Sequence, residues 1–231
     1  MKTIGMIGGM SWESTAIYYQ RINELVKQSL GGLHSAKIIL YSLDFQEIES
    51  LQKQERWDEA GLCMVKAAKS LRAAGADFLI ICTNTMHKLV PVIESAVNIP
   101  VLHIADPTAE AIKKTGIQRI GLLGTRFTME QDFYRGRLES KHGLEVIIPD
   151  ANDRELVHNV IYNELCLGLI RDSARQAYRD VIRRLTDRGA QGIILGCTEI
   201  SMLVAPSDSP VPLFDTTSLH ALSAVEFALM R

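Results

Sequence analysis

Short apolar runs rich in β-branched residues alternate along this chain with longer stretches in which apolar residues recur at helical spacing. Runs of the first kind predict strands at Thr3–Ile7, Lys37–Leu43, Phe78–Cys82, Pro100–His103, Arg119–Leu123, Leu144–Ile148, Gly192–Gly196 and Pro210–Phe214. Stretches of the second kind predict helices, among them Ser14–Ser29, Trp57–Ala74, Met129–Lys141 and Ser173–Arg188. Strands that are apolar on both faces must be covered on both faces. The alternation therefore predicts an α/β fold in which parallel sheets are flanked by helices.

The same order of motifs occurs twice in the chain. Residues 4–8 read Ile-Gly-Met-Ile-Gly and residues 120–124 read Ile-Gly-Leu-Leu-Gly, while Gly75 and Gly189 each open a Gly-Ala segment that leads into an apolar strand. A period this long indicates a duplicated domain, because the repeats of solenoids are much shorter. We predict two pseudo-symmetric domains, residues 1–110 and 111–231, with the last helix able to pack back on the first domain.

The repeat places two chemically different residues at matching positions. Gly75 and Gly189 are 114 positions apart, and the same spacing aligns Thr83 with Cys197. Each of these two residues directly follows a predicted strand. A duplicated fold presents matching positions as a facing pair, so we expect a hydroxyl and a thiol to face each other across the cleft between the domains.

Small and polar residues follow several of the predicted strands. These segments are Gly8–Ser11, Thr83–Thr85, Gly124–Thr125 and Cys197–Glu199. In open α/β sheets, ligands bind beyond the carboxyl ends of the strands, where the N–H groups of helix N-termini point outward. We therefore expect these segments to bind a small anion, such as a carboxylate, in the interdomain cleft.

Composition and charge exclude several classes of protein. The 231 residues carry a net charge of −2, with neither a basic footprint for nucleic acid nor a Lys/Arg run for a membrane surface. No apolar run is long enough to span a membrane, and the first residues read as a buried strand rather than a signal peptide. Four widely spaced cysteines predict free thiols in a reducing cytoplasm, and the scattered histidines offer no metal site. These features predict a cytoplasmic protein that binds no metal, nucleic acid or membrane. Beyond what composition indicates, we expect a homodimer that acts on a small molecule without a cofactor.

Five stretches of sequence occur in an order typical of one family. They read Ile-Gly-Met-Ile-Gly-Gly-Met-Ser-Trp-Glu-Ser at 4–14, Cys-Thr-Asn-Thr-Met-His at 82–87, Leu-His-Ile-Ala-Asp at 102–106, Leu-Leu-Gly-Thr-Arg-Phe-Thr-Met at 122–129 and Gly-Cys-Thr-Glu at 196–199. With them the chain resembles the aspartate/glutamate racemase superfamily, in particular its aspartate racemase branch. The resemblance implies two pseudo-symmetric α/β domains and an enzyme that inverts the α-carbon of an amino acid without pyridoxal phosphate or metal.

In that family two thiols flank the α-carbon, and one removes a proton while the other delivers one from the opposite face. Inverting a stereocentre by proton transfer needs a base on one side and an acid on the other. A thiol suits both roles because its ordinary pKa, about 8.5, lies near operating pH. A helix N-terminus just after Cys197 would favour the thiolate, and backbone amides would hold the substrate carboxylate and the developing negative charge.

The chain departs from the family at one of the two thiols. The first-half motif of the family is usually Cys-Asn-Thr, whereas this chain has Thr83-Asn84-Thr85. A hydroxyl can donate or relay a proton, but its alkoxide is too costly at neutral pH to serve readily as the abstracting base. We therefore predict that Cys197 is the base and Thr83 the opposing donor, with kinetics that favour L-substrates.

The remaining cysteines have structural interpretations. Cys82 is an alternative second thiol, although adjacent residues on a strand point to opposite sides and would direct it into the core. Cys63 and Cys166 lie in helical patterns among apolar neighbours, and we expect both to be core thiols.

Six further residues are candidate substrate contacts. They are Met10, Gln52, Asn84, Thr85, Thr198 and Glu199. Met10 fits either a pocket lining or a hydrophobic plug, and Gln52 fits either a partner for the side-chain carboxylate or a solvated helix end. The other four also suit helix caps, a role compatible with carboxylate binding. His87 and His103 either tune the site or are structural, and Glu164 lies roughly where some strict aspartate racemases have a lysine.

Other functions stay open at the level of sequence. The thiol lost at Thr83 is compatible with a non-catalytic amino-acid-binding protein derived from a racemase, and a single-thiol site with a decarboxylase or cis–trans isomerase of the same superfamily. A nucleotide-binding module is disfavoured, since the glycines at 5, 8 and 9 do not form Gly-x-Gly-x-x-Gly and no Walker pattern occurs. The sequence favours a cofactor-independent racemase that acts on aspartate, glutamate or a similar amino acid.

Overall fold

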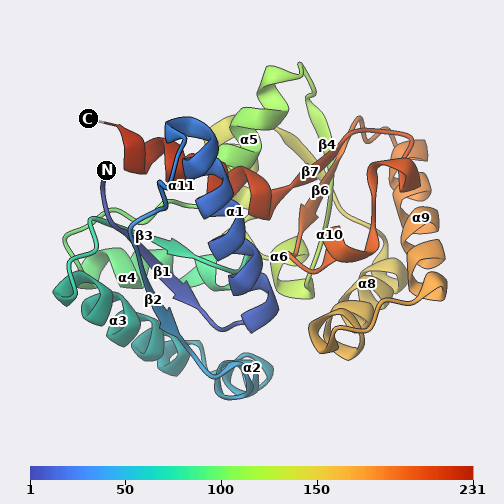
Figure 1. The fold of residues 1–231 in the computed structure, drawn as a ribbon. Coiled ribbons are helices and arrows are strands. Elements are labelled where there is room, and N and C mark those ends of the chain that lie inside the picture. The colour runs from blue at the N-terminus through green and yellow to red at the C-terminus, as the bar shows by residue number, and fades with distance from the viewer. Residues whose placement is uncertain (231) are drawn as a thin grey trace. The chain divides into compact units, whose positions relative to one another are not determined.

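The computed structural model describes residues 1–230. Contacts between residues divide the chain into two units, one made of Met1–Ile104 together with the chain from His220 onward and the other of Ala105–Leu219. Each unit contains one parallel β-sheet flanked by helices (Figure 1). The α/β fold class predicted from the alternation of apolar runs is confirmed.

The first unit contains β1 (Ile4–Gly8), α1 (Trp12–Leu30), β2 (Ile38–Ser42), α2 (Phe45–Lys53), α3 (Trp57–Ala73), β3 (Phe78–Ile81), the 3-10 helix η1 (Thr85–Leu89), α4 (Val90–Ala96) and most of α11 (Thr216–Leu229). Its sheet has the strand order β2-β1-β3. The central strand, β1, runs parallel to both neighbours, with Gly8 opposite Ser42 and Ile7 opposite Ile81. The third strand therefore ends next to the end of β1, just before Thr83.

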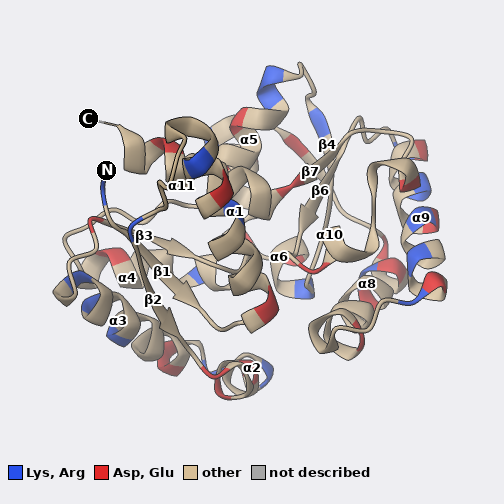
Figure 2. Ribbon diagram, viewed as in Figure 1, with Lys and Arg blue, Asp and Glu red and all other residues tan. Residues whose placement is uncertain are grey.

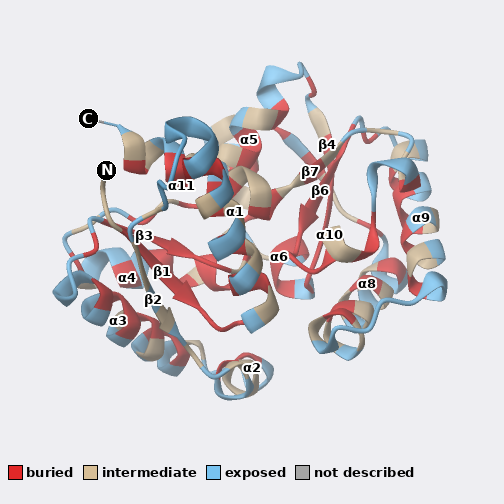
Figure 3. Cartoon of the chain, in the orientation of Figure 1, coloured by how far each residue is buried: buried red, intermediate tan, exposed pale blue. Residues whose placement is uncertain are grey.

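The sheet of the first unit is covered on both faces, as its near-continuous apolar strands require. Along β3, Phe78 and Ile80 pack with residues of α1 and α11, whereas Leu79 and Ile81 pack with residues of α3 and α4. Figure 3 shows β1 and β3 buried along their length, with the exposed residues on the outer sides of the helices. The core of this unit therefore consists of two apolar layers separated by the sheet.

The second unit contains α5 (Ala105–Lys114), β4 (Arg119–Gly124), α6 (Arg126–Glu130), α7 (Arg135–His142), β5 (Glu145–Ile147), α8 (Ala151–Asn163), the 3-10 helix η2 (Leu165–Leu167), α9 (Asp172–Asp187), β6 (Ile193–Gly196), α10 (Ile200–Leu203), the 3-10 helix η3 (Pro206–Asp208) and β7 (Leu213–Asp215). Its parallel sheet has the order β5-β4-β6-β7, with Gly124 opposite Gly196. β4 is thus the counterpart of β1, and β6, which ends just before Cys197, is the counterpart of β3.

Tight backbone packing fixes the turn after β1. Gly9 has φ +88°, a value in the left-handed region that L-residues rarely adopt. A Cβ added to Gly9 would lie 2.1 Å from the carbonyl oxygen of Leu43. The Gly9 N–H donates to Thr15 Oγ1 at 2.8 Å, and the Thr15 hydroxyl donates to the Ser11 carbonyl at 2.9 Å. The turn that precedes α1 is therefore held against the end of β2 with no room for a side chain at position 9.

One carboxylate in the second unit binds three basic side chains. Asp106, in the first turn of α5, accepts hydrogen bonds from Arg137 Nε at 2.7 Å, Arg137 Nη2 at 2.8 Å, Lys141 Nζ at 2.8 Å and His142 Nε2 at 2.9 Å. Burial alone would raise the pKa of Asp106, but the hydrogen bonds from these three residues of α7 lower it well below its ordinary value. This cluster ties α5 to α7.

Charged residues of both signs are spread over the helices, and few lie on the strands (Figure 2). Among the described residues, no helix is long and apolar enough to cross a membrane. Within residues 1–230, no three His, Cys, Asp or Glu side chains are grouped as the ligands of a metal ion would be.

The predicted strand at Pro100–His103 was wrong. This segment pairs with β3 through a single bridge, between Leu79 and Val101. The Pro100 carbonyl accepts from the Leu79 N–H at 2.8 Å, but proline has no N–H with which to extend the ladder. The chain then enters α5 at Ala105, which leaves no length for a strand.

The predicted helix at Met129–Lys141 is interrupted at residues 131–134. Helix α6 ends at Glu130, where Gln131 takes an extended conformation (φ −96°, ψ 149°), and α7 begins at Arg135. Tyr134 is fully buried although it lies in the break. Its burial continues the apolar spacing across the interruption, so the sequence pattern looked helical throughout.

Candidate active site

Cys197 lies directly after β6 in the second unit and is buried, with 9% of its surface exposed. Its thiol donates a hydrogen bond to Glu199 Oε2, with Sγ and Oε2 2.9 Å apart. The Thr198 hydroxyl donates to the same oxygen at 2.7 Å. The Gly-Cys-Thr-Glu stretch therefore folds so that a buried carboxylate accepts hydrogen bonds from the two residues before it.

This environment keeps the thiol protonated. Burial raises the pKa of Cys197 well above its ordinary value, and the negative charge of Glu199 and the proximity of Cys166 raise it further. The following helix, α10, is only four residues long and contributes little of a helix dipole. The expectation that a helix N-terminus favours the thiolate was therefore wrong.

Thr83 lies two residues beyond the end of β3 in the first unit and is half-buried. Two side chains hold the carbonyl groups at this point of the chain. The Ser14 hydroxyl donates to the Cys82 carbonyl at 2.9 Å, and the His87 Nδ1 atom lies 2.8 Å from the Thr83 carbonyl oxygen. The backbone on both sides of Thr83 is therefore fixed by residues of α1 and η1.

The other cysteines differ in burial. Cys82 is fully buried and packs with the α1 and α11 layer of the core, as predicted from strand alternation. Burial raises the pKa of its thiol far above the ordinary value. Cys63 and Cys166 are only half-buried, so neither lies fully inside the core as expected, although Cys63 packs against the apolar layer of α3 and α4.

The candidate substrate contacts of the first unit are buried around the end of β3. Asn84 and Thr85 are 2% and 5% exposed, and Met10 belongs to the apolar layer that also contains Met86. Gln52 is 3% exposed, and its Nε2 atom donates to Met86 Sδ at 3.0 Å. The interpretation of Gln52 as a solvated helix end was therefore wrong, and the burial of Met10 favours a hydrophobic plug.

The helix-cap interpretation does not hold for two of the candidates. Asn84 precedes η1 and Glu199 precedes α10, but neither side chain caps its helix. The carboxylate of Glu199 instead accepts from Cys197 and Thr198. The sequence pattern had marked Glu199 as a substrate contact, and it contained no signal for this hydrogen bond from the Cys197 thiol.

Glu164, the residue considered as the counterpart of a lysine, has a different partner. Its carboxylate lies 3.7 Å from Arg171 Nη1, and its side chain is 18% exposed. A mostly buried carboxylate in an ion pair offers no positive charge to a substrate carboxylate.

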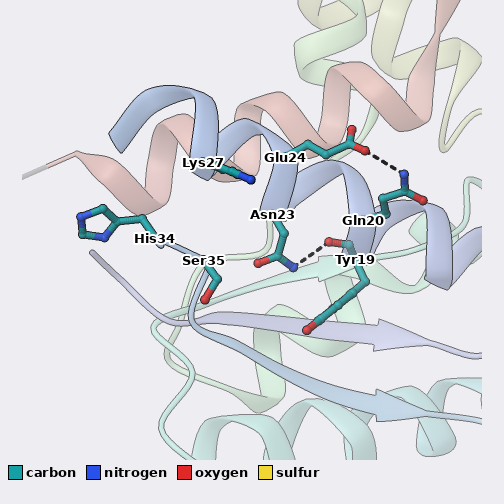
Figure 4. A pocket seen from close by; sticks show the side chains of 7 residues that line it. All are labelled: Tyr19, Gln20, Asn23, Glu24, Lys27, His34 and Ser35. Carbon is teal, nitrogen blue, oxygen red and sulfur yellow. Dashed lines mark hydrogen bonds between the residues drawn. The ribbon is translucent and has the colours of Figure 1, made fainter. Parts of the chain in front are cut away.

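A surface cavity of about 500 Å³ lies in the first unit away from these residues. It is lined by Tyr19, Gln20, Asn23, Glu24, Lys27, His34 and Ser35 (Figure 4). Two of its polar side chains are already engaged, since Gln20 donates to Glu24 at 2.7 Å and Asn23 donates to the Tyr19 carbonyl at 2.8 Å. None of the candidate catalytic or substrate-binding residues lines this cavity.

The sequence model of the Asp/Glu/hydantoin racemase family matches residues 7–224, nearly the whole chain. This protein belongs to the Asp/Glu/hydantoin racemase family. The matched range includes Thr83, which follows β3 beside β1, and Cys197, which follows β6 beside β4.

Three similar proteins illustrate the range of the family. A broad-specificity amino-acid racemase, RacX of Bacillus subtilis strain 168, is 23% identical over 228 residues, which is 96% of each chain. The crystal structure of a candidate Asp/Glu racemase from Yersinia pestis is 60% identical, with a TM-score of 0.93 and complete coverage of both chains. That of an aspartate racemase homologue from Pyrococcus horikoshii OT3 is 34% identical, with a TM-score of 0.85 and again complete coverage.

Proposed function

We propose that this protein is a cofactor-independent racemase of aspartate, glutamate or a similar amino acid, in which Cys197 is the base and Thr83 the opposing proton donor. The observation that carries the proposal is the hydrogen bond from the Cys197 thiol to the buried carboxylate of Glu199, in a chain of the racemase family. The 114-residue repeat that aligns Thr83 with Cys197 supports the pairing of the two residues on one substrate.

The Cys197–Glu199 pair accounts for proton removal by a thiol with a raised pKa. As the L-substrate approaches, Glu199 takes the thiol proton and the sulfur takes the α-proton. The electron pair of the broken C–H bond stays on the substrate and spreads into its carboxylate. The Cys197–Glu199 pair carries one negative charge whether the proton lies on the sulfur or on the carboxylate. Forming the thiolate therefore adds no second buried charge.

On the other face, the Thr83 hydroxyl passes a proton to the α-carbon and takes one from water. The hydroxide left behind is neutralised by the proton that Glu199 releases to solvent, which returns Glu199 to its carboxylate form. Thr83 is half-buried rather than buried, which supports access of water to this residue. This step gives the D-enantiomer without forming a free alkoxide. The reverse reaction makes the hydroxyl accept the α-proton of the D-substrate, which is the harder step.

The proposed asymmetry is kinetic. Two enantiomers have equal free energy in solution, so kcat/KM for inversion must be equal in the two directions. A preference for L-substrates therefore lies in the separate values of kcat and KM and in exchange of the α-proton without inversion. Exchange without inversion needs only Cys197.

Substrate contacts are proposed from both sets of strand-end residues. Asn84 and Thr85 in the first unit and Thr198 in the second would bind the α-carboxylate and α-amino group, while Gln52 would donate to a side-chain carboxylate. Met10 would form the apolar wall that excludes water.

The free thiols expected for the four cysteines support a cytoplasmic location. We also propose that the protein acts as a homodimer.

The test is α-proton exchange, followed by NMR in deuterated buffer with no added pyridoxal phosphate. L- and D-aspartate and L- and D-glutamate would be incubated separately with the wild-type, Cys197→Ala and Thr83→Ala proteins. We expect exchange that depends on Cys197, is faster for the L-forms, and yields the opposite enantiomer only when Thr83 is present. Exchange with loss of carbon dioxide would instead show a decarboxylase, and absence of exchange with any acidic amino acid would overturn the proposal.

A further inference from the structure

Three histidines of the first unit form a buried cluster beside Thr83. His87 is 1% exposed, and its ring lies against those of His103 and His220 at centroid distances of 4.8 and 5.5 Å. His220 is fully buried and lies against Tyr18 at 5.7 Å. These side chains come from α1, η1, the segment before α5 and α11, and the mechanism proposed above uses none of them.

The hydrogen bonds fix which nitrogens carry protons. A carbonyl oxygen can only accept, so His87 Nδ1, at 2.8 Å from the Thr83 carbonyl, must carry a hydrogen. For the same reason His220 Nε2, at 2.9 Å from the Leu102 carbonyl, carries a hydrogen, and its Nδ1 accepts from the Tyr18 hydroxyl at 2.9 Å. Burial and the neighbouring His103 lower the pKa of His87 well below its ordinary value, so the ring is neutral.

The turn that His87 contacts lacks the support of a regular element. Thr83 lies between the end of β3 at Ile81 and the start of η1 at Thr85, outside the hydrogen-bond ladder of the sheet. Side-chain hydrogen bonds therefore hold the backbone carbonyls in this turn, as hydrogen bonds between strands hold them within the sheet. Ser14 holds the Cys82 carbonyl and His87 holds the next carbonyl, that of Thr83.

We propose that His87 is the positioning residue for Thr83, and that its Nδ1–H, through the hydrogen bond to the Thr83 carbonyl, sets where the Thr83 hydroxyl meets the α-carbon. This inference rests on the proposed role of Thr83 as the proton donor. A misplacement of about 1 Å can cost about 100-fold in rate, so a donor that lies on an irregular turn needs such a support. Cys197 lies in the other unit, and its exchange of the L-substrate proton does not depend on His87.

Two substitutions separate the hydrogen bond from the bulk of the ring. Asparagine places its side-chain N–H close to the position of histidine Nδ1, so His87→Asn keeps the donor. Leucine fills space without any donor, so His87→Leu removes it. His103→Leu is the matched control, because it changes a buried histidine of the same cluster that touches the His87 ring.

The readout is the rate of D-aspartate formation divided by the rate of α-proton exchange from L-aspartate, both at saturating substrate in deuterated buffer. We expect His87→Leu to lower this ratio at least about tenfold, His87→Asn to restore it to within about threefold of wild type, and His103→Leu to leave it near wild type. A merely structural role would lower both rates together and leave the ratio unchanged.

The same experiment separates the failure of each proposal. Normal exchange with an unchanged ratio in His87→Leu, or an equal fall in the leucine and asparagine variants, would overturn the role of His87 alone. No exchange by the wild-type protein would overturn the proposed function and the role of His87 with it. Long-range ¹⁵N NMR of the histidine rings in the wild-type protein is an independent check, because a His87 that carries its proton on Nε2 instead of Nδ1 contradicts the proposal without reference to activity.

Discussion

Cys197 and Glu199 are separated by one residue, and their side chains meet because the chain turns directly after β6. The repeat identified Cys197 as a candidate, since repeated motifs align by position. It could not show the contact between Sγ and Glu199 Oε2, because the approach of two side chains within a turn depends on backbone angles that no spacing encodes. For the same reason the sequence could not predict the hydrogen bond from His87 Nδ1 to the Thr83 carbonyl.

Replacing Glu199 by glutamine should separate the reactivity of the Cys197 thiol toward alkylating agents from its proposed role as the base. Glutamine has the size of glutamate but cannot take the thiol proton, so we expect Cys197-dependent exchange from L-aspartate to fall about 100-fold. The charge that raises the pKa of Cys197 is also lost, so alkylation of Cys197 by iodoacetamide should become faster at pH 8. Mass spectrometry of the labelled peptide measures the second effect.

Glu164→Gln is the control, because this carboxylate pairs with Arg171. Exchange and alkylation that both fall in Glu199→Gln would mean that the carboxylate only supports the local fold.

Thr83→Cys should restore the thiol that the repeat calls for. A thiol accepts a proton far more readily than a hydroxyl does, so we expect α-proton exchange from D-aspartate to rise at least about tenfold. Exchange from L-aspartate should stay within about threefold of wild type, because Cys197 is unchanged. Thr83→Ser is the matched control, and an equal gain in Thr83→Ser would show that the effect is not due to the thiol.

At the scale of elements, the sequence pattern was reliable where one strand or helix buries a regular face and failed where packing is irregular. The strands expected around β1, β3, β4 and β6 were found within one or two residues of their predicted ends. Pro100–His103 has strand-like composition, but Pro100 lacks the N–H that would extend its single bridge to β3 into a ladder, and Tyr134 is buried outside any helix. In both places a residue is buried without belonging to the helix or strand that its sequence pattern predicts. The apolar pattern therefore indicates burial and does not by itself identify the type of element.

Asp106→Asn should loosen the contact between α5 and α7. Three basic side chains would then surround an uncharged amide, so we expect the free energy of unfolding at pH 7 to fall by about 2 kcal/mol. Because the pKa of Asp106 is lowered, its contribution is present above the ordinary carboxyl pKa of about 3.9 and is lost only as the pH falls through the lower folded value. Urea denaturation at pH 7 and pH 5 should therefore give the same difference between variant and wild type.

Glu145→Gln removes an exposed ion pair with Arg119 and should cost less than about 1 kcal/mol. If Asp106→Asn and Glu145→Gln lowered the free energy of unfolding by the same amount, the Asp106 cluster would contribute no more than an exposed ion pair.

At the scale of the whole molecule, buried titratable groups limit stability on both sides of neutral pH. The pKa of His87 is lowered, so below pH about 6.5 the unfolded chain binds a proton that the folded chain excludes, and stability falls with decreasing pH. The pKa values of Cys82 and Cys197 are raised, so above pH about 8.5 the unfolded chain loses protons that the folded chain keeps, and stability falls with increasing pH. The free energy of unfolding should be highest between these limits.

Each such group changes the slope by up to about 1.4 kcal/mol per pH unit. Urea denaturation from pH 5 to pH 10 measures the slopes. His87→Asn should flatten the acid side, where His103 and His220 are the titratable side chains packed against His87 and Tyr18 binds His220 in turn. Cys82→Ala should flatten the alkaline side. Unchanged slopes in both variants would show that other groups set the pH dependence.

The division of the chain into units has a consequence for how the protein is made. One apolar layer of the first unit contains Ala221, Ala224 and Val225 of α11 beside Tyr18 and Ile22 of α1. The intervening 115 residues, Ala105–Leu219, all belong to the other unit. At about 5–20 residues per second, a ribosome that has finished residue 104 needs roughly 6–23 seconds more to deliver the helix that closes this layer. The second unit therefore emerges complete before the first, and the apolar layer that α1 begins on the sheet of the first unit stays incomplete until α11 has been made.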